Sequence, residues 1–217
     1  MLKHLMRHFG FVTLMLIACA TLAVAQDLNP VSLPPPQTSG GRPFMQVLKD
    51  RHSTREFSNQ KLPPQVLSNL LWAAFGVNRP DGKRTAPSAM NWQEIDIYVA
   101  TQDGLYLYDA KANALNLVLT QDVRGATGQQ AFVKEAAVNL VYVADLGKTG
   151  RAGGEDQTLY TAADTGFIAQ NVYLFCASEG LAAVVRGSVD RAALARLIKL
   201  RPNQKIILAQ TVGYPKQ

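Results

Sequence analysis

The stretch AADTGFIAQNVYLFCASEGLAAVVRG, residues 162–187, carries the strongest structural signal in the chain. Small and large apolar residues lie nearly all round a helix predicted over 160–177, so we expect this helix to be buried rather than to lie on the surface. Gly180 is expected to end the helix, and the apolar run at 181–185 predicts a short strand after it. These residues predict one buried helix followed by a short strand.

The segments on either side alternate irregularly between helix and strand. Hydrophobic spacing predicts further helices over 44–51, 63–76 and 190–199, and strands over 94–100, 105–110, 115–119, 138–145 and 205–214. The Asp103-Gly104 pair predicts a hairpin turn, and a Gly-rich mobile loop is expected over 148–157. One hairpin within an irregular alternation indicates an α+β fold with a mixed, mainly antiparallel central sheet flanked by helices.

Residues 1–25 differ from the rest of the chain. A short basic segment, an apolar stretch and the small residues around Ala25 predict a Sec signal peptide cleaved after Ala25, and therefore export to the periplasm. Two alternatives stay open: Cys19 fits a lipobox, in which case a lipid would hold the protein at a membrane, and the apolar stretch could stay as an anchor. Residues 26–42 predict a flexible linker, so the folded domain is expected to span 43–217.

Charge and residue usage exclude several classes of function. The chain has 22 Lys and Arg against 16 Asp and Glu, and the charge falls from +6 to +4 when Lys3 and Arg7 leave with the signal peptide. The basic residues are scattered, which argues against a nucleic-acid partner. The mature domain would hold one histidine, His52, and one cysteine, Cys176, which excludes an internal disulfide and a zinc site made of Cys and His. Its chemistry is expected to depend on a bound cofactor or on very few side chains.

Three short segments could bind a ligand. The run from Arg51 to Arg55 offers two guanidinium groups and two hydroxyls, which suit a phosphate, although a solvated basic turn fits it equally well. The polar loop 87–93 can hydrogen-bond a flat heterocycle, or it is an ordinary turn. Gly187, after the strand at 181–185, would let a backbone N–H approach a ligand ring, or it marks a plain strand end.

Three side chains in the long helix have a structural interpretation. Asp164 and Glu179 are the carboxylates that look most interior, and a helix cap or a core ion pair is favoured over acid–base catalysis for both. Cys176 stands among apolar residues and is expected to be an inert core thiol.

Five segments, taken in order, resemble the FMN-dependent nitroreductase superfamily, and within it the group that includes the SagB-type dehydrogenases. They are RHSTREF (51–57), LSNLLWAAFGVNR (67–79), APSAMNWQ (86–93), the stretch 162–187 and AQTVGYP (209–215). This resemblance implies an α+β homodimer with two FMN molecules in the clefts between the subunits. The apolar helix around Phe167, Val172 and Leu174 agrees with a dimer, because its second face can be buried against a partner.

The resemblance also implies individual site residues. Arg51 and Ser53 would hold the phosphate and ribityl chain, with His52 beside them. Arg55 would lie on the pyrimidine side of the flavin, where a cation stabilises the negative charge of the reduced ring. The loop supplied by the other subunit would contribute Pro87, Ser88, Asn91 and Gln93. Backbone groups facing the flavin N5 edge would come from Val185, Arg186 and Gly187, and the basic residue near the C-terminus that grips the phosphate would be Lys216.

The implied reaction is a two-step oxidoreduction. NAD(P)H or another donor would reduce FMN by hydride transfer to N5 and leave, and a nitroaromatic or quinone-like acceptor would then take the electrons. Nicotinamide cofactors are cytoplasmic, so export implies either a different donor or the oxidation of an exported substrate. The alternative is a degenerate family member that binds flavin without turnover. No metal is expected in either case.

Overall fold

The computed structural model describes residues 30–150 and 153–216, so the predicted signal peptide, its cleavage site and the lipobox lie outside the described residues. The helices are α1 (Phe44–Asp50), α2 (Pro64–Phe75), α3 (Gly154–Glu179) and α4 (Arg191–Leu197). The strands are β1 (Val31–Ser32), β2 (Ile95–Thr101), β3 (Gly104–Asp109), β4 (Ala114–Leu119), β5 (Val138–Asp145), β6 (Ala182–Arg186) and β7 (Gln204–Gly213). The described residues also form four 3-10 turns: η1 (Ala89–Asn91), η2 (Arg124–Thr127), η3 (Ala131–Lys134) and η4 (Leu146–Lys148).

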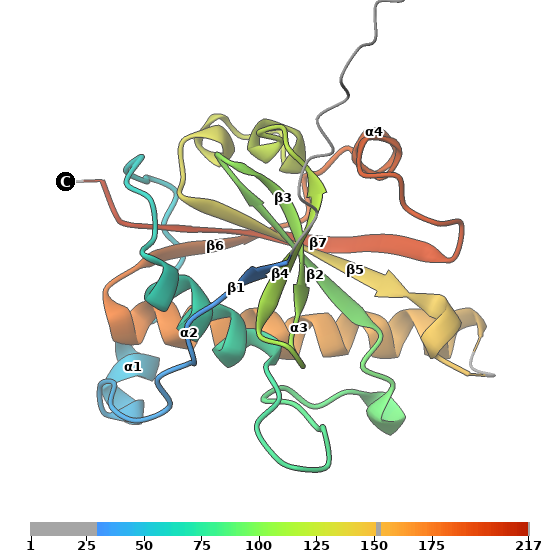
Figure 1. The fold of residues 1–217 in the computed structure, drawn as a ribbon, viewed down its shortest axis with the longest axis horizontal. Helices are drawn as coiled ribbons and strands as arrows, with labels where there is room; N and C mark the ends of the chain where they lie inside the picture. Colours follow the sequence, from blue (N-terminus) through green and yellow to red (C-terminus); the bar gives the residue numbers. More distant parts are fainter. Residues whose placement is uncertain (1–29, 151–152, 217) are drawn as a thin grey trace, which may run out of the picture.

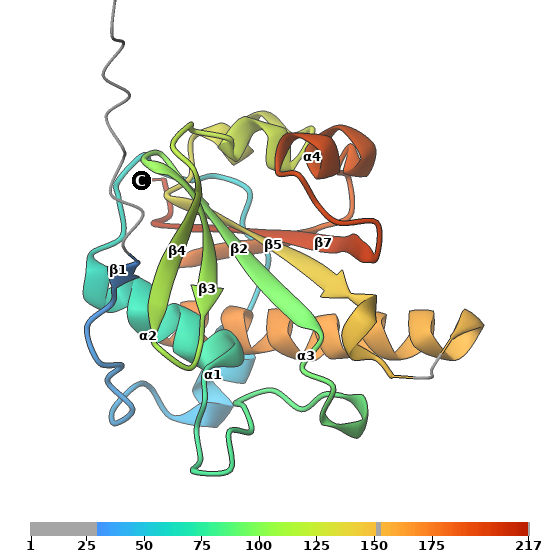
Figure 2. The same cartoon turned by 45° about the vertical axis from the view of Figure 1, so that its right-hand side comes forward.

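The strands form one sheet in the order β1-β4-β3-β2-β5-β7-β6. All the strand pairs within the described residues are antiparallel, so the α+β class is confirmed, while the sheet is antiparallel rather than mixed. Helices α1, α2 and α3 cover one face, and α4 with the turns η2 and η3 covers the other (Figures 1 and 2). All eight residues of β5 are buried, as expected for a strand covered on both faces.

The alternation of side chains along the strands divides the core into two parts. Ile97 and Val99 of β2 face α2 and α3, whereas Tyr98 and Ala100 join the cluster under α4. Both clusters are apolar, so burial on the two sides of the sheet is the main stabilising contribution.

Helix α3 is longer than the prediction over 160–177 and is buried on one face alone. It begins at Gly154, inside the loop predicted over 148–157, and ends at Gly180, whose φ of 70° is the left-handed conformation that glycine adopts readily. Within this chain the opposite face is open to solvent, and Phe167 is 48% exposed there. The expectation of a helix buried all round is therefore wrong for a single chain.

Residues 30–42 are not a flexible linker, which corrects that part of the prediction for 26–42. Val31 and Ser32 pair with β4 as an edge strand, and the next residue, Leu33, is buried in the core. Ser68 Oγ of α2 donates a 2.5 Å hydrogen bond to the carbonyl oxygen of Pro34. These contacts are made with residues far along the chain, so the local composition of the segment gave no sign of them.

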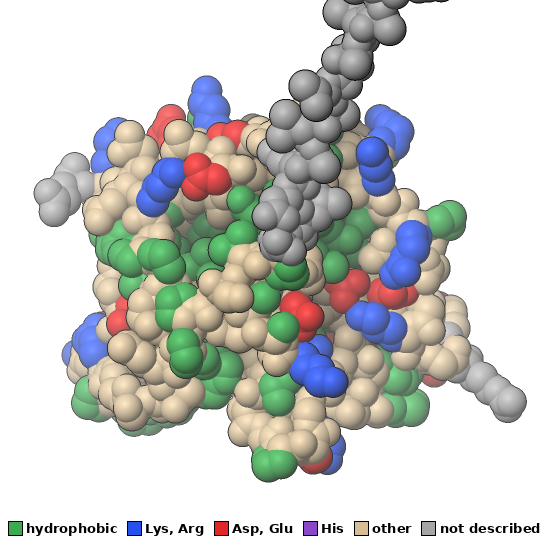
Figure 3. Space-filling model, viewed as in Figure 1, with side chains coloured by type: hydrophobic (Ala, Val, Ile, Leu, Met, Phe, Trp, Pro, Cys, Tyr) green, Lys and Arg blue, Asp and Glu red, His purple; other side chains and the backbone are tan. Residues whose placement is uncertain are grey.

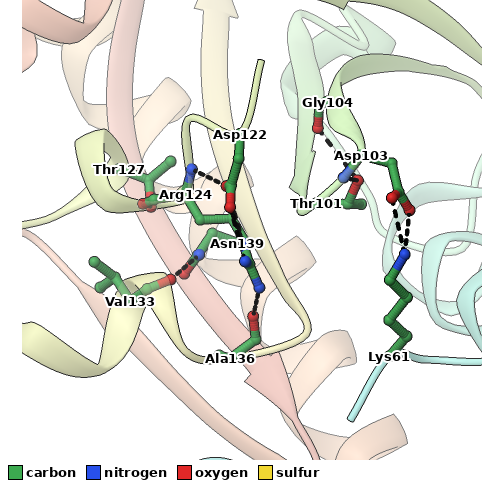
Figure 4. A network of polar contacts seen from close by, with 10 residues as sticks. All are labelled: Lys61, Thr101, Asp103, Gly104, Asp122, Arg124, Thr127, Val133, Ala136 and Asn139. Atoms are coloured by element: carbon green, nitrogen blue, oxygen red, sulfur yellow. Dashed lines mark hydrogen bonds and ion pairs between the residues drawn. The ribbon is translucent and has the colours of Figure 1, made fainter. Parts of the chain in front are cut away.

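Polar contacts hold the turns η2 and η3 and the hairpin between β2 and β3 in place (Figure 4). Arg124 is buried, with its guanidinium bonded to the carboxylate of Asp122 and to the carbonyl oxygen of Ala136. Lys61 Nζ lies 2.8 Å from Asp103 Oδ1 at the rim of a mainly apolar hollow of about 300 Å³. Apolar side chains gather over β1 and α2 on this face (Figure 3).

Candidate functional site

The segment that follows α1 lies against the outer edge of β6. The Thr54 N–H donates a 2.9 Å hydrogen bond to the carbonyl oxygen of Ala183, so the segment continues the hydrogen bonding of the sheet beyond its last strand. Phe57 forms an isolated antiparallel bridge with Pro215, near the C-terminus. The predicted residues Arg51, His52, Ser53 and Arg55 therefore stand at the edge of the strand that carries Val185, Arg186 and Gly187.

Tyr173 of α3 joins the two sides of this edge. Its hydroxyl accepts the Val185 N–H at 2.8 Å and lies 2.8 Å from Ser53 Oγ. The guanidinium of Arg51 lies over the Tyr173 ring, 5.3 Å from the ring centroid, in a cation–π contact. One tyrosine thus orders two of the residues predicted to hold a phosphate.

His52 and Arg55 differ in how firmly they are held. His52 Nδ1 lies 2.6 Å from the Asp50 carbonyl oxygen, and because that oxygen can only accept, Nδ1 carries the proton. Arg55 is exposed and shares a pocket of about 300 Å³ with Lys216, which is also exposed. The Lys216 N–H donates to the carbonyl oxygen of Glu56 at 3.3 Å, so the C-terminal segment runs beside Arg55. Lys216 thus lies beside Arg55, and its predicted contact with a phosphate stays a prediction.

The side chain of Arg186 does not face the edge where the other predicted residues gather. Its guanidinium is buried and donates to the hydroxyl oxygen of Thr211, the carbonyl oxygen of Thr127 and the side-chain oxygen of Asn139. Burial lowers the pKa of Arg186 to about 10. At this position the backbone alone is available to a ligand. Gly187, next to it, is exposed with open space around its Cα.

The loop 87–93 has a constrained backbone. Met90, Asn91 and Gln93 all have positive φ, at 47°, 55° and 49°, a region that costs non-glycine residues roughly 1–2 kcal/mol each. The Gln93 N–H donates to Ser88 Oγ at 3.1 Å, which closes the loop on itself. Met90 projects from the loop and is 79% exposed.

Four predicted residues on this loop have different surroundings. Pro87 and Asn91 are exposed and Ser88 is half-buried, so their side chains are accessible to a ligand or a partner. Gln93 is engaged within the chain, because its Oε1 accepts from Arg84 Nε at 2.8 Å and its Nε2 donates to Asn91 Oδ1 at 3.1 Å. Gln93 is thus a support of the loop in this chain.

Within one chain the two groups of predicted residues are apart. The loop 87–93 is attached to α3 at Asp164, whose Oδ2 accepts the Ala89 N–H at 2.9 Å, whereas Ser53 meets α3 at Tyr173. These two positions are nine residues apart, which is about 13 Å along a helix. A single chain therefore does not bring all the predicted cofactor residues together.

The structure shows the surroundings of the three α3 side chains for which the sequence suggested a structural role. Cys176 is buried, and burial raises its pKa, as expected for an inert core thiol. Glu179 is exposed, so it is not an interior carboxylate as predicted. Asp164 is buried, but it caps the Ala89 N–H of the loop instead of forming an ion pair, and it lies beside a second buried carboxyl group, that of Glu94.

The sequence interpretation missed Tyr173 and Glu94 as members of the site. Tyr173 stands in an apolar helix and Glu94 begins a strand. Their neighbours in the sequence therefore predict ordinary positions in the core or on the surface and give no sign of a site. The pattern that could have suggested Tyr173 is a phenol among apolar residues near the end of the helix, since a hydroxyl withdrawn from water needs a partner.

Comparison with known proteins places the chain in a family. Residues 48–214 match the family model described as the nitroreductase family. One relative is MJ1384 of Methanocaldococcus jannaschii, whose name describes it as an inferred nitroreductase. It is 31% identical to this chain over 165 residues, and the match covers 71% of this chain and 83% of that protein. A crystal structure of a similarly named protein from Ralstonia eutropha is 44% identical, with a TM-score of 0.83 over 87% of this chain and 90% of that one.

The fold also extends to more distant structures. The NADPH:FMN oxidoreductase of Vibrio harveyi, solved with NAD+, is 23% identical and has a TM-score of 0.62 over 80% of this chain and 69% of that one, which shows a common fold. The protein is thus an α+β oxidoreductase of the flavin-dependent type. The chain belongs to the nitroreductase family, whose members generally use FMN. None of the helices within residues 30–150 and 153–216 is long and apolar enough to cross a membrane.

Proposed function

We propose that this protein is an exported, FMN-dependent oxidoreductase of nitroreductase type that acts as a homodimer. The observation that carries the proposal is the edge of β6, where Tyr173 holds Ser53 and Arg51 beside the backbone of Val185. This edge combines a guanidinium group and a hydroxyl, the donors that a phosphate needs, with a strand end that is open at Gly187.

The residues present fit FMN. Arg51 and Ser53 would hold the phosphate and ribityl chain, with His52 next to them and Lys216 as a further cation. Arg55 would lie on the pyrimidine side, and the backbone of Val185, Arg186 and Gly187 would line the ring. The Val185 N–H already has a partner in Tyr173, so Gly187, with open space around it, offers the closer approach.

A homodimer would complete the site. The outer face of α3 exposes Leu159, Tyr160 and Phe167, and α1 exposes Phe44 and Met45 near it, so this side of the molecule carries a large apolar surface. A two-fold axis across the middle of α3 would make the two helices antiparallel and bring the loop of one protomer toward the β6 edge of its partner. Pro87, Ser88 and Asn91 would then act from the other subunit.

The chemistry follows from the small number of reactive side chains. FMN, when bound, supplies the redox chemistry, so the chain has to bind it, orient it and adjust its electrostatics. Arg55 would stabilise negative charge on the ring, and Cys176 is too deeply buried to take part. We propose a small-molecule substrate, with NAD(P)H or another donor in one step and a nitroaromatic or quinone-like acceptor in the other. The SagB-type dehydrogenases are the group we propose as most similar in chemistry.

The proposal of export rests on the sequence of residues 1–25, with the periplasm as the destination and a lipid anchor at Cys19 as the alternative. Fractionation of cells that express the full chain, with the N-terminal sequence of the product, tests this point. Soluble periplasmic protein beginning at Gln26 supports cleavage after Ala25, and a membrane-bound product beginning at Cys19 supports lipidation.

The visible spectrum of the purified protein, before and after FMN is added and the free flavin removed, tests the cofactor. Retained flavin near one per chain is expected, and a colourless protein that binds no FMN would remove the proposed function. Steady turnover of a quinone or nitroaromatic with NAD(P)H would then show catalysis. Retained flavin without turnover of any donor and acceptor pair would favour the alternative, a flavin-binding protein that has lost activity.

A further inference from the structure

Two buried carboxyl groups lie side by side where the loop 87–93 meets α3. Glu94, directly before β2, is completely buried, and Asp164 of α3 is 3% exposed. Within the described residues neither of them belongs to an ion pair. No hydrogen-bond donor from another residue meets either side-chain oxygen of Glu94, so its polar neighbour is the carboxyl group of Asp164. Two unpaired carboxylates cannot both be charged at low cost in such a place, so the pair retains a proton.

The surroundings indicate which group holds the proton. Burial raises the pKa of Asp164 as well, but Asp164 accepts the Ala89 N–H at 2.9 Å, and this hydrogen bond acts against the rise by favouring the charged form. Burial is the main factor that raises the pKa of Glu94, to about 7, and the negative charge of Asp164 adds to the effect. Below about pH 7 Glu94 is thus the neutral member of the pair, while the hydrogen bond from Ala89 favours the charge on Asp164.

The other charged groups around Glu94 and Asp164 reduce the rise in the pKa of Glu94 without removing it. From η4, Lys148 lowers the pKa of Glu94, but its Nζ lies 2.6 Å from Asp96 Oδ1 on β2. From β5, Asp145 donates its N–H to the Glu94 carbonyl oxygen, while its carboxylate is bound by Arg201. Lys148, the basic group that acts on Glu94, is thus already paired with another carboxylate.

The pair lies directly under the strained loop. Ala89, which donates to Asp164, begins the 3-10 turn η1, and the positive φ angles of Met90, Asn91 and Gln93 follow at once. Such a backbone persists because surrounding contacts hold it, and the contact from α3 to the loop backbone goes through Asp164. A change in the charge of the pair therefore acts on the loop.

We propose that Glu94 and Asp164 are positioning residues that share one proton, and that this proton holds the loop 87–93 in the conformation seen here. The link to a cofactor rests on the proposed function, because Pro87, Ser88 and Asn91 of this loop are the residues we expect to contact FMN. Loss of the proton puts a second charge beside Asp164 and loosens the loop. FMN affinity accordingly falls as the pH rises.

Trp92 gives a readout that needs no flavin. It lies in the loop with its ring 6.0 Å from that of Tyr160, and Trp72 is the other tryptophan of the chain, so Trp72→Phe leaves Trp92 as the sole reporter. Its fluorescence in the full chain is titrated from about pH 5 to about pH 9. A transition with a midpoint near pH 7 is expected, absent when Glu94→Gln is added and kept when Glu179→Gln, at an exposed carboxylate on α3, is added instead.

A flat titration, or a transition that Glu94→Gln leaves unchanged, overturns the proposal. If Glu94→Gln does not fold, Asp164→Asn serves in its place, because an asparagine oxygen still accepts the Ala89 N–H. Removing the like charge makes Glu94 easier to ionise, so the midpoint is expected to move to lower pH. An unmoved midpoint in Asp164→Asn contradicts the sharing of a proton.

FMN affinity, measured by quenching of flavin fluorescence, tests the link to the site. The wild-type protein is expected to bind FMN about tenfold more weakly at about pH 8.5 than at about pH 6, and Glu94→Gln is expected to bind about equally at both. If the FMN affinities of the wild-type protein and of Glu94→Gln depend on pH to the same extent, the proposed link between the shared proton and FMN binding is overturned. Failure of the wild-type protein to bind FMN at any pH overturns the proposed function instead, and the Trp92 titration still tests the proton.

Discussion

The hydroxyl oxygen of Tyr173 lies 2.8 Å from Ser53 Oγ, and it also accepts the N–H of Val185 at 2.8 Å. The phenol therefore receives one hydrogen bond from the strand edge and has its own proton left for Ser53. In this way α3 orients a side chain on the segment after α1, although the two are 120 residues apart in the chain. Because the Ser53 side chain is oriented before a ligand binds, less conformational entropy is lost when it contacts the ligand.

Tyr173→Phe is expected to weaken FMN binding about tenfold and to destabilise the protein by about 1–2 kcal/mol, because the Val185 N–H loses its partner and Ser53 is no longer oriented. Fluorescence titration with FMN and urea unfolding measure the two effects. Tyr106→Phe, on β3 and away from this edge, is the matched control and should change FMN affinity little. Equal affinities for Tyr173→Phe and the wild-type protein would contradict the role given to the phenol.

Arg51→Ala is expected to weaken the binding of FMN by about tenfold or more and that of riboflavin by much less, because riboflavin lacks the phosphate that the guanidinium would hold. The ratio of the two dissociation constants is the quantity to measure. Arg196→Ala removes an exposed arginine on α4 and should leave the ratio as it is. An equal loss for both ligands would show that Arg51 does not contact the phosphate.

Phe167→Glu is expected to turn a dimer into a monomer, because it places a charge on the apolar face of α3. Light scattering should give twice the mass of one chain for the wild-type protein and the mass of one chain for the variant. The variant should also lose FMN, since the loop of the second subunit is removed with the dimer. Leu197→Glu, on α4 at the opposite face, should stay dimeric, and a monomeric wild-type protein would refute the shared site.

Gly128→Ala is expected to destabilise the protein by about 1–3 kcal/mol, because an added Cβ would overlap the guanidinium of Arg186, which is buried and held by three neighbours. Gly125→Ala, in the same segment, would meet nothing closer than a 3.8 Å contact with Lys134 and should change stability little. Thermal unfolding of the two variants compares them directly, and equal melting temperatures would show that Arg186 moves aside at little cost.

Glu94→Gln is expected to stabilise the protein at about pH 8 and to change stability little near pH 4.5. The pKa of Glu94 is raised from 4.5 to about 7 in the folded chain, chiefly by burial, so the folded state binds the extra proton between these values. The free energy of unfolding of the wild-type protein therefore falls as the pH rises through this window, by on the order of 3 kcal/mol. Urea unfolding at both pH values measures the difference, and Glu179→Gln should show none.

Local patterns were enough to predict most of the elements. The apolar face at 63–76, the Asp103-Gly104 turn and the buried run at 138–145 each gave the observed helix, hairpin or strand within a few residues. Periodicity and turn chemistry are properties of neighbouring residues, so a single sequence contains them. The run from Arg51 to Arg55 was found as a possible phosphate site in the same way, because its side-chain types suit a phosphate. The separate roles of Arg51, Ser53 and Arg55 toward FMN came from the resemblance to the nitroreductase superfamily.

Contacts between segments that are distant in the chain could not be predicted from local sequence patterns. The pairing of Val31 with Leu115, the bond from Tyr173 to Ser53 and the meeting of Glu94 with Asp164 each join parts of the chain whose local sequence is unremarkable. Such contacts form because the sheet order and the path of α3 bring the segments together. The sequence thus determines which side chains this protein can use, and the packing of the sheet against α3 determines which of them meet.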